Sequence, residues 1–402
     1  MAVINSASSS RELSNKHNRP VNSLQSPVLP ETGDVRDLVC FSHLRWNFVY
    51  QRPQHLLSRA TQHYRVWFIE EPIYDNSGLR MSVCRQDDQL HVLVPHLPHG
   101  TTPADALRLQ RQLVDQFLAD ERIADFIAWY YTPMALLFSD HLQPQLTVYD
   151  CMDELSAFWG APPQLLEQEK RLLQRAGVVF TGGYSLYEAK QHRHPRVFAF
   201  PSSIDFSHFS TARQNQTDPA DQQAIPHPRI GFSGVIDERF DYDLIGEVAR
   251  RRPDWHFVLI GPIVKIDQAL LPKSDNVHYL GMKAYKELPT YLSNWDVAML
   301  PFALNDSTRY ISPTKTPEYL AAGLPVVSTP IRDVVRTYGT EDFVLIAESA
   351  DAFEQAIELA LAGKHPGDWS AIDTFLIENS WNRTWNDMHR LMVAEMNVAV
   401  EQ

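Results

Sequence analysis

Short apolar runs alternate with amphipathic segments along most of the chain. Segments such as RPQHLLSRATQH carry apolar residues at helical spacing, whereas the runs between them are dense in β-branched and aromatic residues. Strands that are apolar on both faces and alternate with helices predict a parallel sheet covered on both sides, that is, an α/β domain of the Rossmann-like kind. In the first half of the chain the predicted strands are DLVCFS (37–42), YRVWFIE (64–70), HVLVP (91–95), DFIAWYY (125–131), LTVYD (146–150), GVVFTG (177–182) and RVFAFP (196–201).

The same alternation restarts after residue 228 and predicts a second Rossmann-like domain. Two such domains in succession leave a cleft between the carboxyl ends of their strands, which is where ligands of such sheets bind. The predicted elements of this half are the strands RIGFSG (229–234), WHFVLIG (255–261), VHYLG (277–281), DVAMLPF (296–302), LPVVST (324–329) and FVLIA (343–347), and the helices 241–252, 285–293 and 350–362.

Two polar segments fall outside this alternation. Residues 1–34 are rich in Ser, Asn and Pro and contain no apolar stretch of the signal-peptide kind, which predicts a disordered tail. TARQNQTDPADQQAIPHP (211–228) breaks the pattern again, which predicts a linker over 210–228. The expected organisation is therefore a domain over 35–209, the linker, and a second domain over 229–379.

Composition and charge narrow the class of partner. With 36 Lys and Arg against 49 Asp and Glu, the net charge of −13 gives no broad positive surface for nucleic acid or anionic lipid. Cys40, Cys84 and Cys151 are odd in number and lack metal-ligand spacing, so reduced thiols in a cytoplasmic compartment are expected. No apolar run approaches the length that crosses a bilayer.

The stretch SPTKTPEYLAAGLPVVSTP (312–330) predicts a helix that begins at an anion site. Pro317 is tolerated only within the first turn of a helix, so the N-cap is expected at about Thr314 or Thr316. The amides at this end are partly unpaired, and the helix dipole favours negative charge there. A helix terminus of this kind that carries a lysine is suited to hold phosphate.

Lys315 and Glu318 carry the candidate chemistry of this helix. Lys315 is placed to meet a phosphate, and the Glu318 carboxylate is placed to accept hydrogen bonds from a diol. The structural alternative is an i,i+3 surface pair at a helix start, worth a few tenths of a kcal/mol, and spacing does not separate the two. Upstream, Gly231 and Gly234 in GFSGVIDER let the backbone approach a ligand, and Arg239 is either a phosphate ligand or a solvated arginine.

SPTKTPEYLAAGLPVVSTP resembles the donor-binding signature of retaining glycosyltransferases of the GT-B fold, especially glycosyltransferase family 4 and its group 1 relatives. The segments SHLRWNFVYQRPQHLLSRA and YDCMDELSAF are similar to a bacterial subgroup that builds cell-surface polysaccharides. The resemblance covers the chain after residue 35, and its other matching segments are PSSIDFSHF (201–209), VHYLGMKAYKELPTYLSNWD (277–296), DVAMLPF (296–302) and NSWNRTWNDM (379–388).

The resemblance implies roles for the two domains. The N-terminal domain binds the acceptor, the second domain binds a nucleotide-sugar donor, and a terminal helix over 380–402 returns to the N-terminal domain. Glu318 matches the glutamate that holds the ribose, but Tyr310 and Val235 replace a glutamate and a basic residue of the family pattern, so sugar recognition is open. The expected donor-binding residues are Gly234, Tyr310, Ser312, Thr314, Lys315 and Glu318, with Arg239 and Lys315 stabilising the leaving phosphate.

The candidate acceptor residues follow two strands of the N-terminal half. His43, Arg45 and Trp46 come after the first strand, where they are expected to contact acceptor or transferred sugar, and His43 is a catalytic candidate. Asp150 and Asp153 follow another strand and are placed to bind sugar hydroxyls. The structural alternatives are a satisfied histidine, a core tryptophan, and carboxylates that cap the next helix.

The expected activity is transfer of a sugar from a nucleoside diphosphate donor of the UDP or GDP type to a saccharide or lipid-linked acceptor. The resemblance implies retention of configuration and no metal or cofactor, and DYD (241–243), in an expected helix, does not supply a metal-binding Asp-x-Asp triplet. A cytoplasmic enzyme is expected, free or at the inner face of the membrane, in an undetermined oligomeric state. A nucleotide-sugar epimerase and a non-catalytic nucleotide-sugar-binding subunit are the alternatives.

Overall fold

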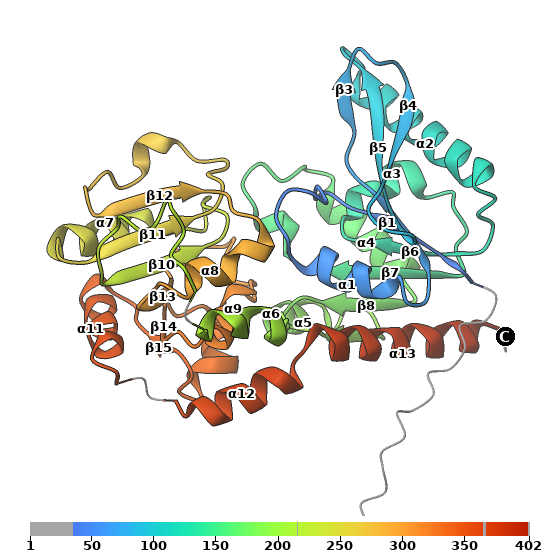
Figure 1. Ribbon diagram of the computed structural model, residues 1–402. Helices are drawn as coiled ribbons and strands as arrows, with labels where there is room; N and C mark the ends of the chain where they lie inside the picture. The colour runs from blue at the N-terminus through green and yellow to red at the C-terminus, as the bar shows by residue number, and fades with distance from the viewer. Residues whose placement is uncertain (1–34, 215, 365–366, 401–402) are drawn as a thin grey trace, which may run out of the picture. The chain divides into compact units, whose positions relative to one another are not determined.

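A computed structural model describes residues 35–214, 216–364 and 367–400, and the tail predicted over 1–34 lies outside them. Two separate sheets, each with helices on both faces, form the described chain (Figure 1). This arrangement confirms the predicted α/β fold with two Rossmann-like domains.

The N-terminal sheet has the strand order β3-β5-β2-β1-β6-β7-β8-β9, and β4 pairs with β5. All pairings are parallel except β4 with β5. The strands are β1 (Asp37–Phe41), β2 (Arg65–Ile69), β3 (Ile73–Asp75), β4 (Arg80–Arg85), β5 (Leu90–Pro98), β6 (Phe126–Tyr130), β7 (Leu146–Cys151), β8 (Val178–Thr181) and β9 (Val197–Ala199).

Helices bury apolar residues against both faces of this sheet. One face is covered by the first and last helices, and Trp381, Trp385, Met388 and Met392 of the last one recur every three or four residues toward the sheet core. The helices of this domain are α1 (Arg52–Ala60), α2 (Pro103–Asp120), α3 (Leu136–Ser139), α4 (Leu165–Arg175), α5 (Tyr184–Lys190) and the returning α13 (Trp381–Val400).

The second sheet has the order β12-β11-β10-β13-β14-β15 and is parallel throughout. Both sheets thus contain the 3-2-1-4-5-6 order of a doubly wound fold, in which ligands bind at the carboxyl ends of the strands. The strands are β10 (Arg229–Ser233), β11 (His256–Ile260), β12 (Val277–Gly281), β13 (Val297–Leu300), β14 (Val326–Ser328) and β15 (Leu345–Ile346), and the helices are α6 (Phe206–Phe209), α7 (Tyr242–Arg251), α8 (Leu288–Leu292), α9 (Lys315–Ala321), α10 (Arg332–Val334), α11 (Ala350–Leu361) and α12 (Trp369–Glu378).

The structure corrects the prediction of a linker over 210–228, because this segment packs on the second domain. Ala212 and Ile225 are buried in the hydrophobic core of the second domain, and buried Gln222 accepts a hydrogen bond from the indole of Trp295. The prediction followed the polar and Pro content and missed that a few apolar residues suffice to hold an irregular segment on a core.

The chain instead crosses between the two sheets twice, through two backbone segments that lie side by side. Ile204 forms a parallel bridge with Ser380, and the amide of Trp381 donates to the carbonyl of Ile204 at 3.2 Å. The outward and returning segments therefore share one short connection.

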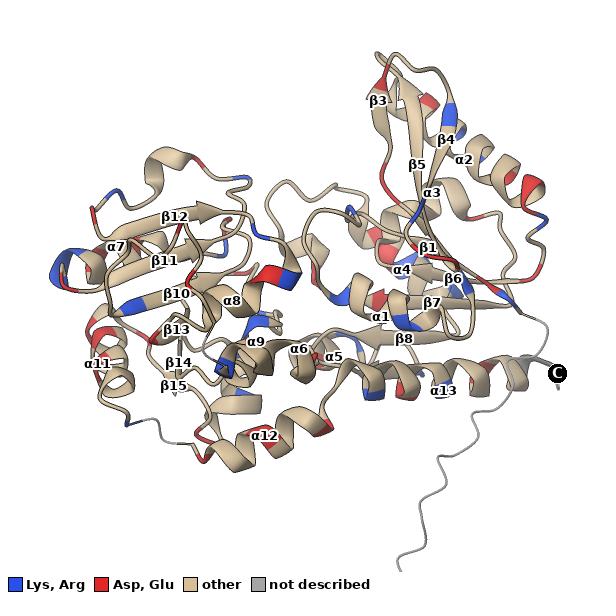
Figure 2. Ribbon diagram, viewed as in Figure 1, with Lys and Arg blue, Asp and Glu red and all other residues tan. Residues whose placement is uncertain are grey.

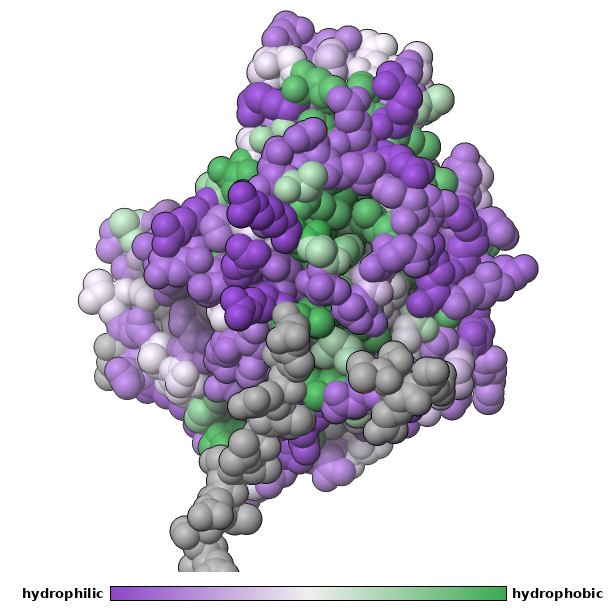
Figure 3. All heavy atoms as spheres, turned by 90° about the vertical axis from the view of Figure 1, so that its right-hand side faces the viewer, coloured by the Kyte–Doolittle hydropathy of each residue, from purple (hydrophilic) through white to green (hydrophobic). Residues whose placement is uncertain are grey.

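The strands β3, β4 and β5 form a flap that projects from the N-terminal sheet and that the sequence pattern did not predict beyond HVLVP (Figure 1). Acidic and basic residues are interspersed over both domains (Figure 2), and the end view shows hydrophobic residues below the hydrophilic tip of the molecule and in a hollow near its centre (Figure 3). Among the described helices, none combines the length and apolar character needed to span a membrane.

Candidate functional site

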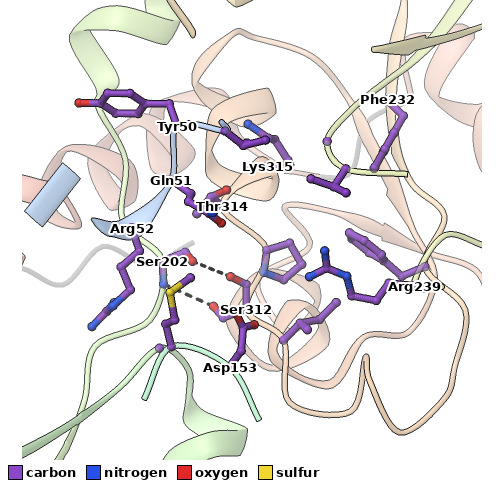
Figure 4. A pocket seen from close by; sticks show the side chains of 18 residues that line it. Tyr50, Gln51, Arg52, Asp153, Ser202, Phe232, Arg239, Ser312, Thr314 and Lys315 are labelled. Carbon is purple, nitrogen blue, oxygen red and sulfur yellow. Dashed lines mark hydrogen bonds between the residues drawn. The ribbon is translucent and has the colours of Figure 1, made fainter. Parts of the chain in front are cut away.

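A cavity of about 140 Å³ lies between the two domains and is lined by residues of both (Figure 4). Its two walls are tied together, because the Ser202 hydroxyl donates to the carbonyl of Ser312 at 2.5 Å and the Ser202 amide donates to the Ser312 hydroxyl at 3.4 Å. The lining residues are Val49, Tyr50, Gln51, Arg52, Met152, Asp153, Gly182 and Ser202 from the N-terminal side, and Phe232, Gly234, Val235, Arg239, Phe302, Ile311, Ser312, Pro313, Thr314 and Lys315 from the other.

Helix α9 brings the predicted donor-binding residues to this cavity. Thr314 is the N-cap residue, although its side chain makes no capping hydrogen bond, and Pro317 sits in the first turn, where its missing amide hydrogen costs nothing. Ser312, Thr314 and Lys315 line the cavity. The proline therefore fixes where the helix begins, and the short loop before it faces the N-terminal domain.

Lys315, which lines the cavity, forms an ion pair with Glu318, which does not line it. The Lys315 Nζ lies 2.5 Å from Oε2 of Glu318, and the exposed fractions of the two side chains are only 11% and 4%. Burial raises the pKa of Glu318, and the neighbouring Lys315 opposes that rise. The alternative of an exposed surface pair is thereby corrected, since the pair exists but is buried.

Arg239 extends toward the centre of the cavity (Figure 4) and is held by a carboxylate. Its guanidinium donates to both oxygens of Asp237 at 2.7–3.2 Å, and the ring of Phe158 lies 5.4 Å from its Cζ. Burial alone would lower the pKa of Arg239, but the Asp237 carboxylate outweighs it and the pKa is raised. A phosphate at Arg239 would therefore share this cation with Asp237.

Asp153 faces Arg239 from the N-terminal wall of the cavity. Burial raises the pKa of Asp153 to about 6; the positive charge of Arg239 lowers it and the negative charge of Asp237 raises it. Asp153 thus lies in the wall that the N-terminal domain contributes to the cavity, and its proton affinity is unusually high for a carboxylate.

The structure corrects the prediction that Asp150 binds sugar hydroxyls. Its carboxylate is fully buried and accepts hydrogen bonds from the guanidinium of Arg52 at 2.8–3.0 Å, while another Arg52 nitrogen donates to the carbonyl of Phe200 at 2.7 Å. Asp150 therefore cannot contact a saccharide. It anchors α1 to the end of β7 and, through Arg52, to the crossing segment.

The residues after β1 lie outside the lining of the cavity. The Arg45 guanidinium donates to Glu70 at 2.9 Å, and the Trp46 ring packs edge-on against Phe68, 5.0 Å between centroids. Burial, with the positive charge of Lys265, lowers the pKa of His43 to about 4. Because His43, Arg45 and Trp46 do not line the cavity, their acceptor contacts stay predictions.

Tyr310 and Gly231 also differ from expectation. Tyr310 packs against the core of the N-terminal domain and lies under the guanidinium of Arg309, outside the cavity lining. A Cβ on Gly231 would come within 2.0 Å of the Trp295 ring, so this glycine serves packing and not ligand approach. Gly234 does line the cavity.

Sequence reasoning missed a stack of aromatic rings beside the cavity. Tyr50 of the N-terminal domain stacks on Tyr285 of the second domain with 4.3 Å between ring centroids, and His208 stacks on Tyr285 at 4.5 Å. Burial and the nearby charge of Glu318 both raise the pKa of Tyr285. The signal in the sequence was the run VYQRPQ, which lies close to the candidate segment SHLRW. This run contains Tyr50 and leads into α1, the helix that follows β1.

The arrangement can hold an anionic group and a polyol together. The cations Lys315 and Arg239 converge on one cavity, and the carboxylates Glu318 and Asp153 lie beside it. Cations are suited to phosphate oxygens, and carboxylates accept hydrogen bonds from sugar hydroxyls. The geometry thus suits a phosphorylated sugar.

Comparison with known proteins supports this chemistry. Residues 228–362 match the family described as glycosyl transferases group 1. A curated relative, the putative teichuronic acid biosynthesis glycosyltransferase TuaH of Bacillus subtilis (strain 168), is 25% identical over 286 residues. That alignment covers 65% of this chain and 66% of the relative, just under two thirds.

Solved structures show the same fold over nearly the whole chain. The E. coli trehalose-6-phosphate structure with bound UDP-2-fluoro glucose aligns with a TM-score of 0.65 at 12% identity, over 89% of this chain and 98% of that one. Sucrose-phosphate synthase from Thermosynechococcus elongatus aligns with a TM-score of 0.60 at 15% identity, over 90% and 94%. The chain is thus similar in sequence to the group 1 glycosyltransferases over residues 228–362, and its fold is the GT-B fold of these solved structures.

Proposed function

We propose that the chain transfers a sugar, with retention of anomeric configuration, from a nucleoside diphosphate donor to a saccharide or lipid-linked acceptor in the synthesis of a cell-surface polysaccharide. The observation that carries the proposal is the buried Lys315–Glu318 pair at the start of α9, beside a cavity that both domains line. The B. subtilis relative, named for teichuronic acid biosynthesis, supports the polysaccharide context, and the UDP-2-fluoro glucose bound in the E. coli structure supports a nucleotide-sugar donor.

In this proposal the second domain stabilises the leaving nucleotide. Lys315 donates to the diphosphate as negative charge develops on it, and Arg239 adds a second cation that Asp237 orients. Fixed charges in a site that excludes water stabilise such a transition state without reorganising. Glu318 holds the ribose diol once Lys315 turns to the phosphate.

No metal ion or cofactor is required in this proposal, because Lys315 and Arg239 supply the positive charge that the leaving group needs. The donor and acceptor meet between the two sheets, so the crossing segment at Ile204 and Ser380 governs how the walls approach each other. We place the enzyme in the cytoplasm, where its free cysteines would stay reduced, either unattached or at the inner face of the membrane.

Calorimetric titration with UDP, GDP, ADP and CMP tests the donor site. We expect one nucleotide to bind, and Lys315→Met to weaken that binding roughly tenfold or more, since a charged hydrogen bond is worth about 1.5–3 kcal/mol. Lys273→Met, at a lysine of the same domain that does not line the cavity, is the matched control and should change nothing. Equal affinity in all three proteins, or no binding of any nucleotide, would contradict the proposal.

Product analysis then separates a transferase from an epimerase. The protein is incubated, without acceptor, with a nucleotide sugar that carries the nucleotide found to bind. A transferase slowly releases nucleotide and free sugar, whereas an epimerase yields an isomerised nucleotide sugar. A non-catalytic subunit yields neither product.

A further inference from the structure

Trp159 is the most exposed large hydrophobic residue among those that the structure describes, with 83% of its surface accessible. It follows the short 3-10 turn Leu155–Ala157, in the loop after β7 that also carries Asp153. Its amide donates to Oε1 of Glu238 in the other domain at 3.0 Å. The backbone of this tryptophan is thus fixed across the cleft while its ring faces solvent.

A groove of about 520 Å³ runs beneath this ring. Residues 156–161 form its N-terminal wall, and Glu238 with residues 305–307 forms the other. Glu238 Oε2 is buried and accepts no hydrogen bond from any described residue, while the Asn305 side-chain amide donates to the Glu238 carbonyl at 3.2 Å. The groove therefore offers an open aromatic face, whereas the unpaired carboxylate oxygen of Glu238 lies buried beside it.

The groove adjoins the cavity between the domains, although no residue lines both. Phe158, in its wall, packs on the Arg239 guanidinium that lines the cavity. At the other end the groove shares Ser156, Ala157 and Asp306 with a second hollow of about 320 Å³, which contains Arg309. An extended ligand in the groove can thus lie near Phe158, which packs on Arg239, at one end and reach toward Arg309 at the other.

The lining chemistry fits a saccharide. A sugar ring presents C–H groups to an aromatic face and hydroxyls to carboxylate and amide groups, and the groove offers both side by side. A phosphate is disfavoured by Glu238 and by the exposed Asp306. A membrane surface is disfavoured too, because Trp159 borders a concave groove whose carboxylates would meet lipid headgroups.

We propose that this groove binds the acceptor saccharide, with one sugar ring on Trp159 and hydroxyls on the exposed Asn305 and Asp306. The proposal rests on the proposed glycosyltransferase function. It places the acceptor away from the residues after β1, where the sequence had predicted it. Trp159 takes the part that was predicted for Trp46, whose ring is packed on Phe68. Glu238 accepts a hydrogen bond from the Trp159 amide and so holds the backbone that carries the ring.

Saturation-transfer NMR with maltotetraose, chitotetraose and tetragalacturonate, each at about 10 mM, tests the groove, since single saccharide sites bind in the millimolar range at modest free energy. We expect at least one tetrasaccharide to bind, Trp159→Ala to weaken it roughly tenfold, and Trp159→Phe, which keeps an aromatic face, to weaken it by less than about threefold. Val83→Ala, at an exposed apolar residue of the flap, is the control and should bind as the wild type does.

Two outcomes overturn the acceptor groove. One is that no tetrasaccharide binds, or that Trp159→Ala binds them as well as the wild type. The other is that Trp159 governs sedimentation with phosphatidylglycerol vesicles in the absence of saccharide binding. Nucleotide titration of the same variants keeps the two proposals apart: unchanged nucleotide affinity with lost saccharide binding supports the groove, and saccharide binding without nucleotide binding would reject only the donor site.

Discussion

Lys315 Nζ lies 2.5 Å from a carboxylate oxygen of Glu318, and both side chains are largely withdrawn from solvent. An exposed i,i+3 pair contributes a few tenths of a kcal/mol, but removing one partner of a buried pair leaves an uncompensated charge. The pair is therefore both a binding device and a structural element. A nucleotide that takes over Lys315 must also satisfy Glu318, which its ribose hydroxyls can do.

Glu318→Gln is expected to weaken nucleoside diphosphate binding roughly ten- to a hundredfold, because a neutral amide replaces a charged acceptor for the ribose diol. The side-chain volume is kept, so the pocket shape does not change. Calorimetric titration measures the effect, with circular dichroism as the folding control. Unchanged affinity would mean that Glu318 serves only the fold.

Stability separates the two roles of the same pair. Lys315→Met should lower the free energy of unfolding by about 3 kcal/mol, because Glu318 is left buried without a partner. The double variant Lys315→Met with Glu318→Gln should recover much of that loss, since no unpaired charge remains. Urea unfolding of the wild type, both single variants and the double variant completes the cycle. Losses below about 0.5 kcal/mol in both single variants would return the pair to the behaviour of a surface pair.

Asp150→Ala is expected to lower the free energy of unfolding by about 3–5 kcal/mol, because it strands the buried Arg52 guanidinium. Asp88→Ala, which breaks the exposed pair with Arg85, is the control and should cost less than about 1 kcal/mol. Urea midpoints give both numbers. A small loss in Asp150→Ala, accompanied by weaker acceptor binding, would restore the sugar-binding role that the sequence predicted for it.

The sequence pattern predicted what depends on local periodicity, namely both sheets and the start of α9. It could not separate Asp150 from Asp153, which lie three residues apart at one strand end, because their environments are set by Arg52 and Arg239 from distant parts of the chain. Asp237 is a similar case, since only the folded loop shows that it holds Arg239. Trp159 could not be singled out either, because exposure, not residue type, distinguishes it from Trp46.

The stack of Tyr50 on Tyr285 joins the two domains beside the cavity. An aromatic pair contributes about 0.5–1.5 kcal/mol beyond its burial. Tyr50→Ala should therefore stabilise the state in which the two cavity walls are apart by that amount, relative to the state in which they are in contact. If nucleotide enters between separated walls, its apparent affinity should rise about two- to tenfold. Tyr50→Phe keeps the ring and should match the wild type.

Calorimetry measures this affinity, and small-angle scattering should report a larger radius of gyration for Tyr50→Ala. A weaker affinity in Tyr50→Ala, with normal affinity in Tyr50→Phe, would instead show that the Tyr50 ring contacts the bound nucleotide.

Asp153 should make stability depend on pH in the acidic range. Burial raises its pKa from 3.8 to about 6 in the folded chain. Between these two values the folded state binds a proton that the unfolded state has released, so the contribution of Asp153 to the free energy of unfolding falls as the pH rises through this window. Asp153→Asn, which cannot ionise and keeps the side-chain volume, should therefore match the wild type near pH 4 and exceed it above about pH 6, by on the order of 2–3 kcal/mol.

Urea unfolding at several pH values from about 4 to 7 gives the curves for Asp153→Asn and the wild type. Asp275→Asn, at a position of the second domain outside the cavity lining, is the control and should track the wild type throughout. A constant difference between Asp153→Asn and the wild type would show that Asp153 stays ionised over the whole range. The attraction of Arg239 would then outweigh both burial and the repulsion of Asp237.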